Sequence, residues 1–166
     1  MRIKYIAVIG MLSALLVVVQ VALGFLPNVE LVSLLIILFT LFFGKKTIYI
    51  IYVFVIVEGF IYGITAWWFN YLYIWTVLFA ITMLYRKNKS GIYWAFINGF
   101  YGLSFGALCS IPYFITLGIP SGFAYWVSGI PFDITHGFFN FAIALALFRP
   151  LYYLFDKVKN HSEILS

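Results

Sequence analysis

Long apolar runs, separated by short clusters of Lys and Arg, constrain this chain more than any other feature. Of its 166 residues, 65% are hydrophobic and only 9% are charged. A soluble domain of ordinary composition has about a quarter charged residues, so this chain has too little charge to cover a globule in water. We therefore expect an integral membrane protein, and the 22% aromatic content suits a surface in contact with lipid.

The apolar runs predict an all-α membrane protein, a bundle of six transmembrane helices. A spanning helix needs roughly 20 apolar residues, and Pro, Gly and charged clusters mark the breaks. The predicted spans are 3–25, 30–44, 47–66, 70–85, 92–112 and 123–148. Residues 1–155 would form one membrane domain, and 156–166 a short cytoplasmic tail.

Three local features refine this prediction. The first run lacks a small-x-small cleavage site, so we interpret it as a retained helix rather than a signal peptide. The second span is short, which indicates a helix that is tilted or surrounded by protein. The segment 112–120 is predicted to be a loop, and Pro131 to kink the last helix.

The basic residues predict the orientation. If the chain crosses a bacterial inner membrane six times and its N-terminus is cytoplasmic, all ten basic residues fall on the cytoplasmic side, and the C-terminus is cytoplasmic as well. The three opposite connections, near 26–29, 67–69 and 112–122, contain no Lys or Arg. The ten are Arg2, Lys4, Lys45, Lys46, Arg86, Lys87, Lys89, Arg149, Lys157 and Lys159. The net charge of +5 therefore indicates orientation in the bilayer rather than nucleic-acid binding.

The motifs of several enzyme classes are missing. The chain has no G-x-x-x-x-G-K-[ST], H-E-x-x-H or G-x-S-x-G, so we expect neither ATP hydrolysis by this chain alone nor another enzyme activity. Its single cysteine, Cys109, excludes an internal disulfide and a thiolate metal cage, and we expect it to be a small buried hydrophobe. The two histidines are too few for a convincing metal site, and no covalently held cofactor is expected.

Acidic residues at membrane depth are costly and are therefore functional candidates. Asp133 and His136 share a helix face at i and i+3, and Asn140 extends it by a turn. This face predicts a polar site, or a buried Asp–His pair that fixes packing. Glu58, near mid-membrane, would bind a ligand, pair with another helix or stay protonated. Glu30 begins the second span, where an acid is favourable in itself.

An aromatic cluster, Trp67–Tyr73, lies on the same predicted side as Glu30 and Asp133. An interfacial belt alone accounts for such a cluster, but aromatic walls with a few polar groups also make small-molecule pockets. We therefore predict one outward-opening pocket, formed by Glu30, Glu58, Trp68, Tyr71, Asp133, His136 and Asn140.

Two stripes of small residues permit close helix contacts. The first runs along the first predicted helix, and the second along the fifth helix in line with Asn98. Each serves internal packing or the docking of another membrane subunit. The stripes are Ala7, Gly10 and Ala14, and Gly102, Gly106 and Ser110.

Over essentially its whole length, the chain resembles the substrate-binding S component of an energy-coupling factor (ECF) vitamin transporter. The resemblance rests on the length, the six predicted spans and three segments: Ile6–Ala14, Leu26-Pro-Asn-Val-Glu30, and Gly129-Ile-Pro-Phe-Asp-Ile-Thr-His-Gly137 with Asn140. It implies capture of a vitamin or related micronutrient from outside. A separate transmembrane coupling subunit and two cytoplasmic ATPase subunits would drive uptake.

The resemblance also implies a role for the first small stripe, because the small residues of the first helix face the coupling subunit in that family. The family's usual pair of alanines four apart is here Gly10 and Ala14. The substitution keeps both positions small, so Ala7, Gly10 and Ala14 are expected to form the docking surface.

The ligand stays open among the family's vitamins and precursors, which include thiamine, riboflavin, pyridoxine-type compounds, queuosine precursors and cobalamin. The acids and aromatics favour a flat nitrogen heterocycle with hydrogen-bond donors or a positive charge. The outer face has no Lys or Arg, which disfavours an anion such as pantothenate, and cobalamin would require a wider, shallower site.

Three other functions stay open. A proton-coupled carrier or channel would use Glu58, Asp133 and His136 as a relay. An intramembrane enzyme would use Asp133 with His136, and an assembly factor would bind no small ligand.

Overall fold

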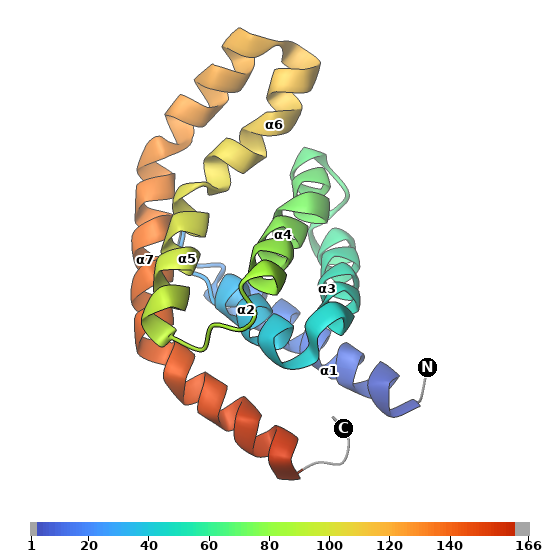
Figure 1. The fold of residues 1–166 in the computed structure, drawn as a ribbon. Coiled ribbons are helices and arrows are strands. Elements are labelled where there is room, and N and C mark those ends of the chain that lie inside the picture. Colours follow the sequence, from blue (N-terminus) through green and yellow to red (C-terminus); the bar gives the residue numbers. More distant parts are fainter. Residues whose placement is uncertain (1–2, 162–166) are drawn as a thin grey trace.

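The computed structural model describes residues 3–161, which form seven α-helices and one short 3-10 helix (Figure 1). The helices run in chain order as α1 Ile3–Leu23, α2 Val32–Phe43, η1 Gly44–Lys46, α3 Thr47–Tyr62, α4 Ala66–Leu84, α5 Gly91–Leu103, α6 Phe105–Leu117 and α7 Ile119–His161. The expected all-α fold is confirmed for these residues.

Among the described residues, five helical runs are long and apolar enough to cross a membrane: Tyr5–Leu23, Val32–Tyr62, Ala66–Leu84, Gly91–Leu117 and Ile119–Val158. This is the pattern of a multi-pass membrane protein. The second run joins α2 to α3 through η1, where Gly44 has a φ of 58° and the chain changes direction (Figure 1).

The short helix α2 lies inside the protein. Its 12 residues extend about 18 Å at 1.5 Å per residue, less than the thickness of a bilayer core. All residues from Val32 to Thr40 are buried, and α4 and α7 pack against them. The prediction that protein rather than lipid surrounds the second span is therefore confirmed.

The predicted loop over 112–120 is wrong. Helix α6 continues to Leu117 and α7 begins at Ile119, with only Gly118 between them. Pro112 is tolerated inside α6 although it has no N–H to donate to the carbonyl oxygen of Leu108. The Tyr73 hydroxyl donates to this oxygen instead, at 2.6 Å, so a side chain from α4 replaces the missing backbone bond.

The predicted spans 92–112 and 123–148 also need correction. The first divides into α5 and α6 at Ser104, and the second extends through α7 to His161. Residues 156–161 of the expected tail are helical, whereas Arg2 and 162–166 lie outside the described residues. The ribbon of α7 is bent along its length (Figure 1), and the helix contains two prolines, Pro131 and Pro150.

The connection between α3 and α4 lies four residues earlier than predicted. It consists of residues 63–65, so Trp67–Phe69 lie in the first turn of α4 rather than in a loop. Gly63, with a φ of 85°, ends α3 by allowing a backbone conformation that other residues rarely adopt.

The second small stripe packs against α7. A Cβ atom added at Gly102 would lie 2.9 Å from Cα of Gly137, which is backbone. One added at Gly99 would lie 2.8 Å from Cβ of Phe141. Gly102 and its neighbour Gly99 must be small for α5 and α7 to touch, and Gly106, in α6, lies against Asp133 of α7. Internal packing therefore accounts for the glycines of this stripe.

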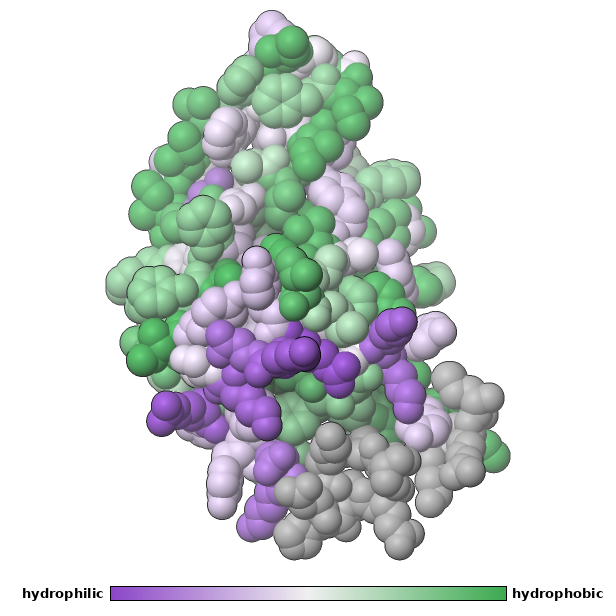
Figure 2. Space-filling model, viewed as in Figure 1, coloured by the Kyte–Doolittle hydropathy of each residue, from purple (hydrophilic) through white to green (hydrophobic). Residues whose placement is uncertain are grey.

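The basic residues gather at one end of the molecule. Lys45 and Lys46 lie in η1, and Lys46 Nζ lies 3.6 Å from the centroid of the Tyr5 ring at the start of α1. Arg86, after α4, donates from Nε to the oxygen of Leu41 at 3.4 Å. Arg149 lies against Gly91, the first residue of α5. Figure 2 shows the resulting hydrophilic band across the lower half of the molecule, with a mostly apolar surface above it.

Candidate ligand-binding cavity

A cavity of about 520 Å³ lies between the α1–α2 connection, α4, α6 and α7. Pockets for small molecules and cofactors commonly have this size. Its lining residues are Gln20, Leu23, Gly24, Leu26, Pro27, Asn28, Val29, Glu30, Tyr71, Trp75, Phe105, Gly106, Cys109, Tyr125, Ser128, Gly129, Phe132, Asp133 and His136.

The cavity lies away from the basic end. Helix α4 contributes Tyr71 and Trp75 from its first half, whereas Arg86 follows its last turn. Helix α7 contributes residues up to His136, whereas Arg149 comes 13 positions later. No Lys or Arg lines the cavity within the described part of the chain.

Glu30 caps the buried helix α2. Its Oε2 accepts a 2.8 Å hydrogen bond from the Ser33 backbone N–H, and the other carboxylate oxygen accepts one from the Ser33 hydroxyl. The Ser33 N–H is one of the backbone donors that a helix N-terminus leaves free. Burial alone would raise the pKa of the Glu30 carboxyl, but the contacts from His136 and Ser33 outweigh it and lower the pKa. These donors therefore favour the ionised form of the Glu30 carboxyl.

Asp133 caps a different helix. Its Oδ1 accepts a 2.8 Å hydrogen bond from the Gly106 backbone N–H, in the first turn of α6. This N–H is free because the chain breaks at Ser104. The side chain is 7% exposed, and its second oxygen, Oδ2, has no hydrogen-bond partner among the described residues. One carboxylate oxygen therefore holds α6, and the other is buried without a partner in a residue that lines the cavity.

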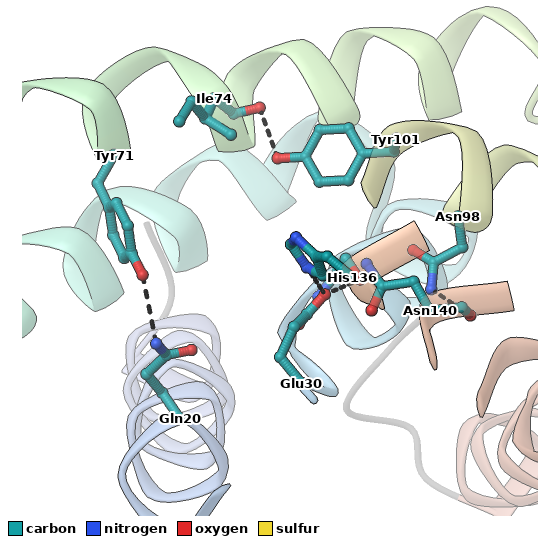
Figure 3. A network of polar contacts seen from close by, with 9 residues as sticks. Gln20, Glu30, Tyr71, Ile74, Asn98, Tyr101, His136 and Asn140 are labelled. Atoms are coloured by element: carbon teal, nitrogen blue, oxygen red, sulfur yellow. Dashed lines mark hydrogen bonds and ion pairs between the residues drawn. The ribbon is translucent and has the colours of Figure 1, made fainter. Parts of the chain in front are cut away.

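His136 faces Glu30 rather than Asp133 (Figure 3). Its Nε2 lies 3.5 Å from Oε1 of Glu30, which is within ion-pair range but long for a hydrogen bond. The imidazole packs edge-on against Phe105, with ring centroids 4.9 Å apart. The expected i, i+3 pair of Asp133 and His136 thus has two separate partners.

Aromatic rings form one wall of the cavity. Tyr71 meets Trp75 edge-on at 5.4 Å between centroids, and Trp75 lies 6.2 Å from Phe105. Trp75 is 2% exposed, and its Nε1 has no hydrogen-bond acceptor among the described residues. The wall thus combines flat apolar surface with one unpaired N–H donor.

Gln20 and Tyr71 join two sides of the cavity (Figure 3). The Gln20 amide Nε2 donates to the Tyr71 hydroxyl at 3.2 Å, which links α1 to α4. Gln20 was not among the predicted site residues, although a lone amide near the end of an apolar helix is the same kind of signal that drew attention to the acids.

Four of the seven predicted pocket residues line this cavity: Glu30, Tyr71, Asp133 and His136. Trp68 does not, because its Nε1 donates to the Val55 oxygen at 2.9 Å and its ring fills the space beside Gly59. Glu58 is 1% exposed within α3, and its Oε1 has no partner among the described residues.

Asn140 lies deeper in the protein than the cavity lining. Its backbone oxygen accepts a 3.0 Å hydrogen bond from Asn98 Nδ2 (Figure 3). The side-chain oxygen and nitrogen of Asn140 are buried without a partner in the described chain. The polar face predicted on the last helix is therefore shared between the cavity and a buried contact with α5.

Sequence reasoning missed most of the remaining lining. Trp75, Phe105 and Phe132 lie in apolar runs where nothing distinguishes a cavity residue from a core residue. Cys109 was expected to be a small buried hydrophobe, but it is partly exposed and lines the cavity. Only the fold reveals these residues, because the break at Ser104 turns α6 over the site.

The first small stripe is on the outer surface. Ala7, Gly10 and Ala14 are all exposed, and a Cβ atom added at Gly10 would meet nothing within 4 Å. The opposite face of α1 is buried, through Leu12 and Leu16.

Comparison with known proteins gives no match: no family model, no curated protein and no solved structure is similar to this chain. The resemblance to ECF S components therefore depends on the chain's own residues, and function must be argued from the cavity and its surroundings.

Proposed function

We propose that this chain is the substrate-capture subunit of an ECF-type micronutrient importer in a bacterial cell membrane. The observation that carries the proposal is the cavity, whose lining residues include an aromatic wall and buried unpaired polar atoms and, within residues 3–161, no Lys or Arg. It would bind a vitamin or vitamin-like heterocycle from the outside.

The proposed topology has six crossings with both termini in the cytoplasm. In this arrangement α2 is a short, buried crossing, and α5 and α6 together make one long crossing. The basic residues of η1, the α4–α5 turn and α7 then share the cytoplasmic side, as the positive-inside rule requires. The cavity opens toward the other side.

The size and lining of the cavity restrict the proposed ligand. A volume of about 520 Å³ suits a one- or two-ring compound better than cobalamin. Trp75 and Phe105 offer surfaces for a flat ring. Glu30 and Asp133, with no Lys or Arg beside them, disfavour an anion such as pantothenate.

The proposed partners are a transmembrane coupling subunit and two cytoplasmic ATPase subunits. The exposed small stripe of α1 supports this part of the proposal, because small residues let another helix approach closely. The chain itself would not be an enzyme, because nucleotide hydrolysis would belong to the partners.

The alternative, a proton-coupled carrier or channel, is less well supported. A relay needs its acids and histidine to be connected, but Asp133 bonds to Gly106, and His136 faces Glu30. Glu58 does not line the cavity. No hydrogen bond found among the described residues connects Glu58 to Asp133 or His136.

Copurification tests the proposed function. Protein extracted gently from its native membrane should retain partner subunits whose peptides contain the G-x-x-x-x-G-K-[ST] motif, and the same cells should take up the ligand in an ATP-dependent way. Uptake driven by a proton gradient, without nucleotide-binding partners, would instead establish the carrier.

A further inference from the structure

The unpaired atoms in the cavity suggest a more specific ligand than the proposed function requires. Three lining residues are at least nine-tenths buried and have a polar atom with no hydrogen-bond partner in the described chain. These atoms are Asp133 Oδ2, Trp75 Nε1 and His136 Nε2. Buried polar atoms are normally satisfied. His136 Nε2 already lies 3.5 Å from Glu30 Oε1, so the atoms that point to a missing partner are Asp133 Oδ2 and Trp75 Nε1.

The two acids of the cavity differ in how their charge is balanced. Glu30 has the Ser33 hydroxyl and backbone N–H as donors, and His136 stands 3.5 Å away. Asp133 has one backbone N–H, from Gly106, and no Lys, Arg or His within salt-bridge distance in the described part of the chain. A buried carboxylate without a counter-ion is costly, so a cation from outside would find its most favourable partner here.

The cavity is unsuited to a bare metal ion. The described residues contain no cluster of three or more His, Cys, Asp or Glu side chains able to hold one. Much of the lining is apolar or aromatic, including Leu23, Phe105 and Phe132. An aromatic wall attracts an organic cation both by burial and by the negative face of its rings.

We propose that the cavity selects a small aromatic organic cation, whose charged N–H group donates to Oδ2 of Asp133 while its ring lies against Trp75 and Phe105. This inference rests on the proposed capture function. It adds that the substrate is positively charged and that Asp133 recognises the charge. Asp133 then has two roles, one oxygen capping α6 and the other binding the ligand.

A matched set of probes isolates charge from shape. Benzamidine, benzamide and benzoate have the same ring and nearly the same size, but are cationic, neutral and anionic at neutral pH. Saturation-transfer NMR titrations on the detergent-purified full chain would rank them. Benzamidine should bind at least tenfold more tightly than benzoate.

Two variants assign this preference to Asp133. Asp133→Asn retains the shape of the side chain and should weaken benzamidine binding about tenfold or more, with little change for benzamide. Glu58→Gln neutralises a buried acid outside the cavity and should leave the ranking unchanged. Melting curves of both variants show whether the protein is folded.

The outcomes separate this inference from the proposed function. A folded protein that prefers benzamide or benzoate, or whose preference for benzamidine survives Asp133→Asn, overturns the cation proposal and leaves capture intact. If the folded wild type binds none of the three probes, both the cation proposal and the cavity as a capture site are contradicted.

Discussion

At the scale of single residues, Asp133 both caps helix α6 and lines the candidate cavity. Its Oδ1 accepts the hydrogen bond from the Gly106 N–H, and the space beside Gly106 is filled by its carboxylate. A Cβ atom added at position 106 would collide with both carboxylate oxygens of Asp133. The small residue at 106 is therefore required by Asp133 rather than by another helix backbone.

We expect Gly106→Ala to displace the Asp133 carboxylate and break its bond to α6. A hydrogen bond to a charged group contributes about 1.5–3 kcal/mol, so the midpoint of thermal unfolding in detergent should fall by several degrees. Gly10→Ala is the matched control, since its added methyl group meets nothing. Equal melting temperatures for the two variants would show that Asp133 does not hold α6.

The sequence predicts which polar residues belong to the site better than it predicts the contacts that these residues make. Asp133, His136 and Glu30 were identified because charge and polarity are rare in this chain. The i, i+3 spacing favoured a contact between Asp133 and His136, but their actual partners come from the α5–α6 break and the α1–α2 connection. Such partners are set by tertiary packing, which spacing along one helix does not contain.

At the scale of helices, Pro112 shows how one element completes another. The sequence predicted a loop around Pro112, because proline in a helix interior normally removes a backbone hydrogen bond. In α6 the Tyr73 hydroxyl donates to the Leu108 oxygen instead, at 2.6 Å. Because Tyr73 is 35 positions earlier in the chain than Leu108, local sequence rules predicted the wrong structure.

A double-mutant cycle measures this replacement. Tyr73→Phe should leave the Leu108 oxygen unpaired and destabilise the protein by about 1–3 kcal/mol. Adding Pro112→Ala restores a backbone N–H at position 112, so the double variant should regain most of that loss. Unfolding midpoints of the four proteins give the coupling, and additive effects would contradict the account of how α6 tolerates proline.

At the scale of the whole molecule, the distribution of charge orders the fold. The sequence predicts that the basic residues lie on one side. In the structure, Lys46 of η1 contacts Tyr5 of α1, Arg86 of the α4–α5 turn contacts Leu41 of α2, and Arg149 of α7 lies beside Gly91 of α5, all at one end of the molecule. This regularity was predictable because each basic cluster lies at an end of an apolar run. The division of one crossing into α5 and α6 was not predictable, because no charged residue marks the break at Ser104.

The proposed orientation predicts which positions a membrane-impermeant thiol reagent reaches. In a Cys109→Ala background, Leu117→Cys at the α6–α7 turn should be labelled in intact cells. Asn88→Cys, in the α4–α5 turn beside the basic residues, should be labelled only after the cells are permeabilised. Labelling of Asn88→Cys from outside would reverse the orientation.

The exposed stripe of α1 predicts a separation of binding from transport. Gly10→Leu and Ala14→Leu add bulk to the outer face of α1, far from the cavity lining, so ligand affinity should stay within about twofold of the wild type. Both should lose uptake and copurification with the ATPase subunits. Met11→Leu is the control, because Met11 is exposed on the same helix and the two side chains have nearly the same size. Normal uptake by both bulky variants would remove α1 as the docking surface.

The most direct test of the central claim is mass spectrometry of small molecules released by denaturing gently purified protein. The wild type should release one aromatic heterocycle in near-stoichiometric amount. Trp75→Leu, which removes part of the cavity wall, should release much less, and Trp126→Leu, outside the lining, should match the wild type. Absence of any such compound from the folded wild type, or equal retention by Trp75→Leu, would contradict capture in this cavity.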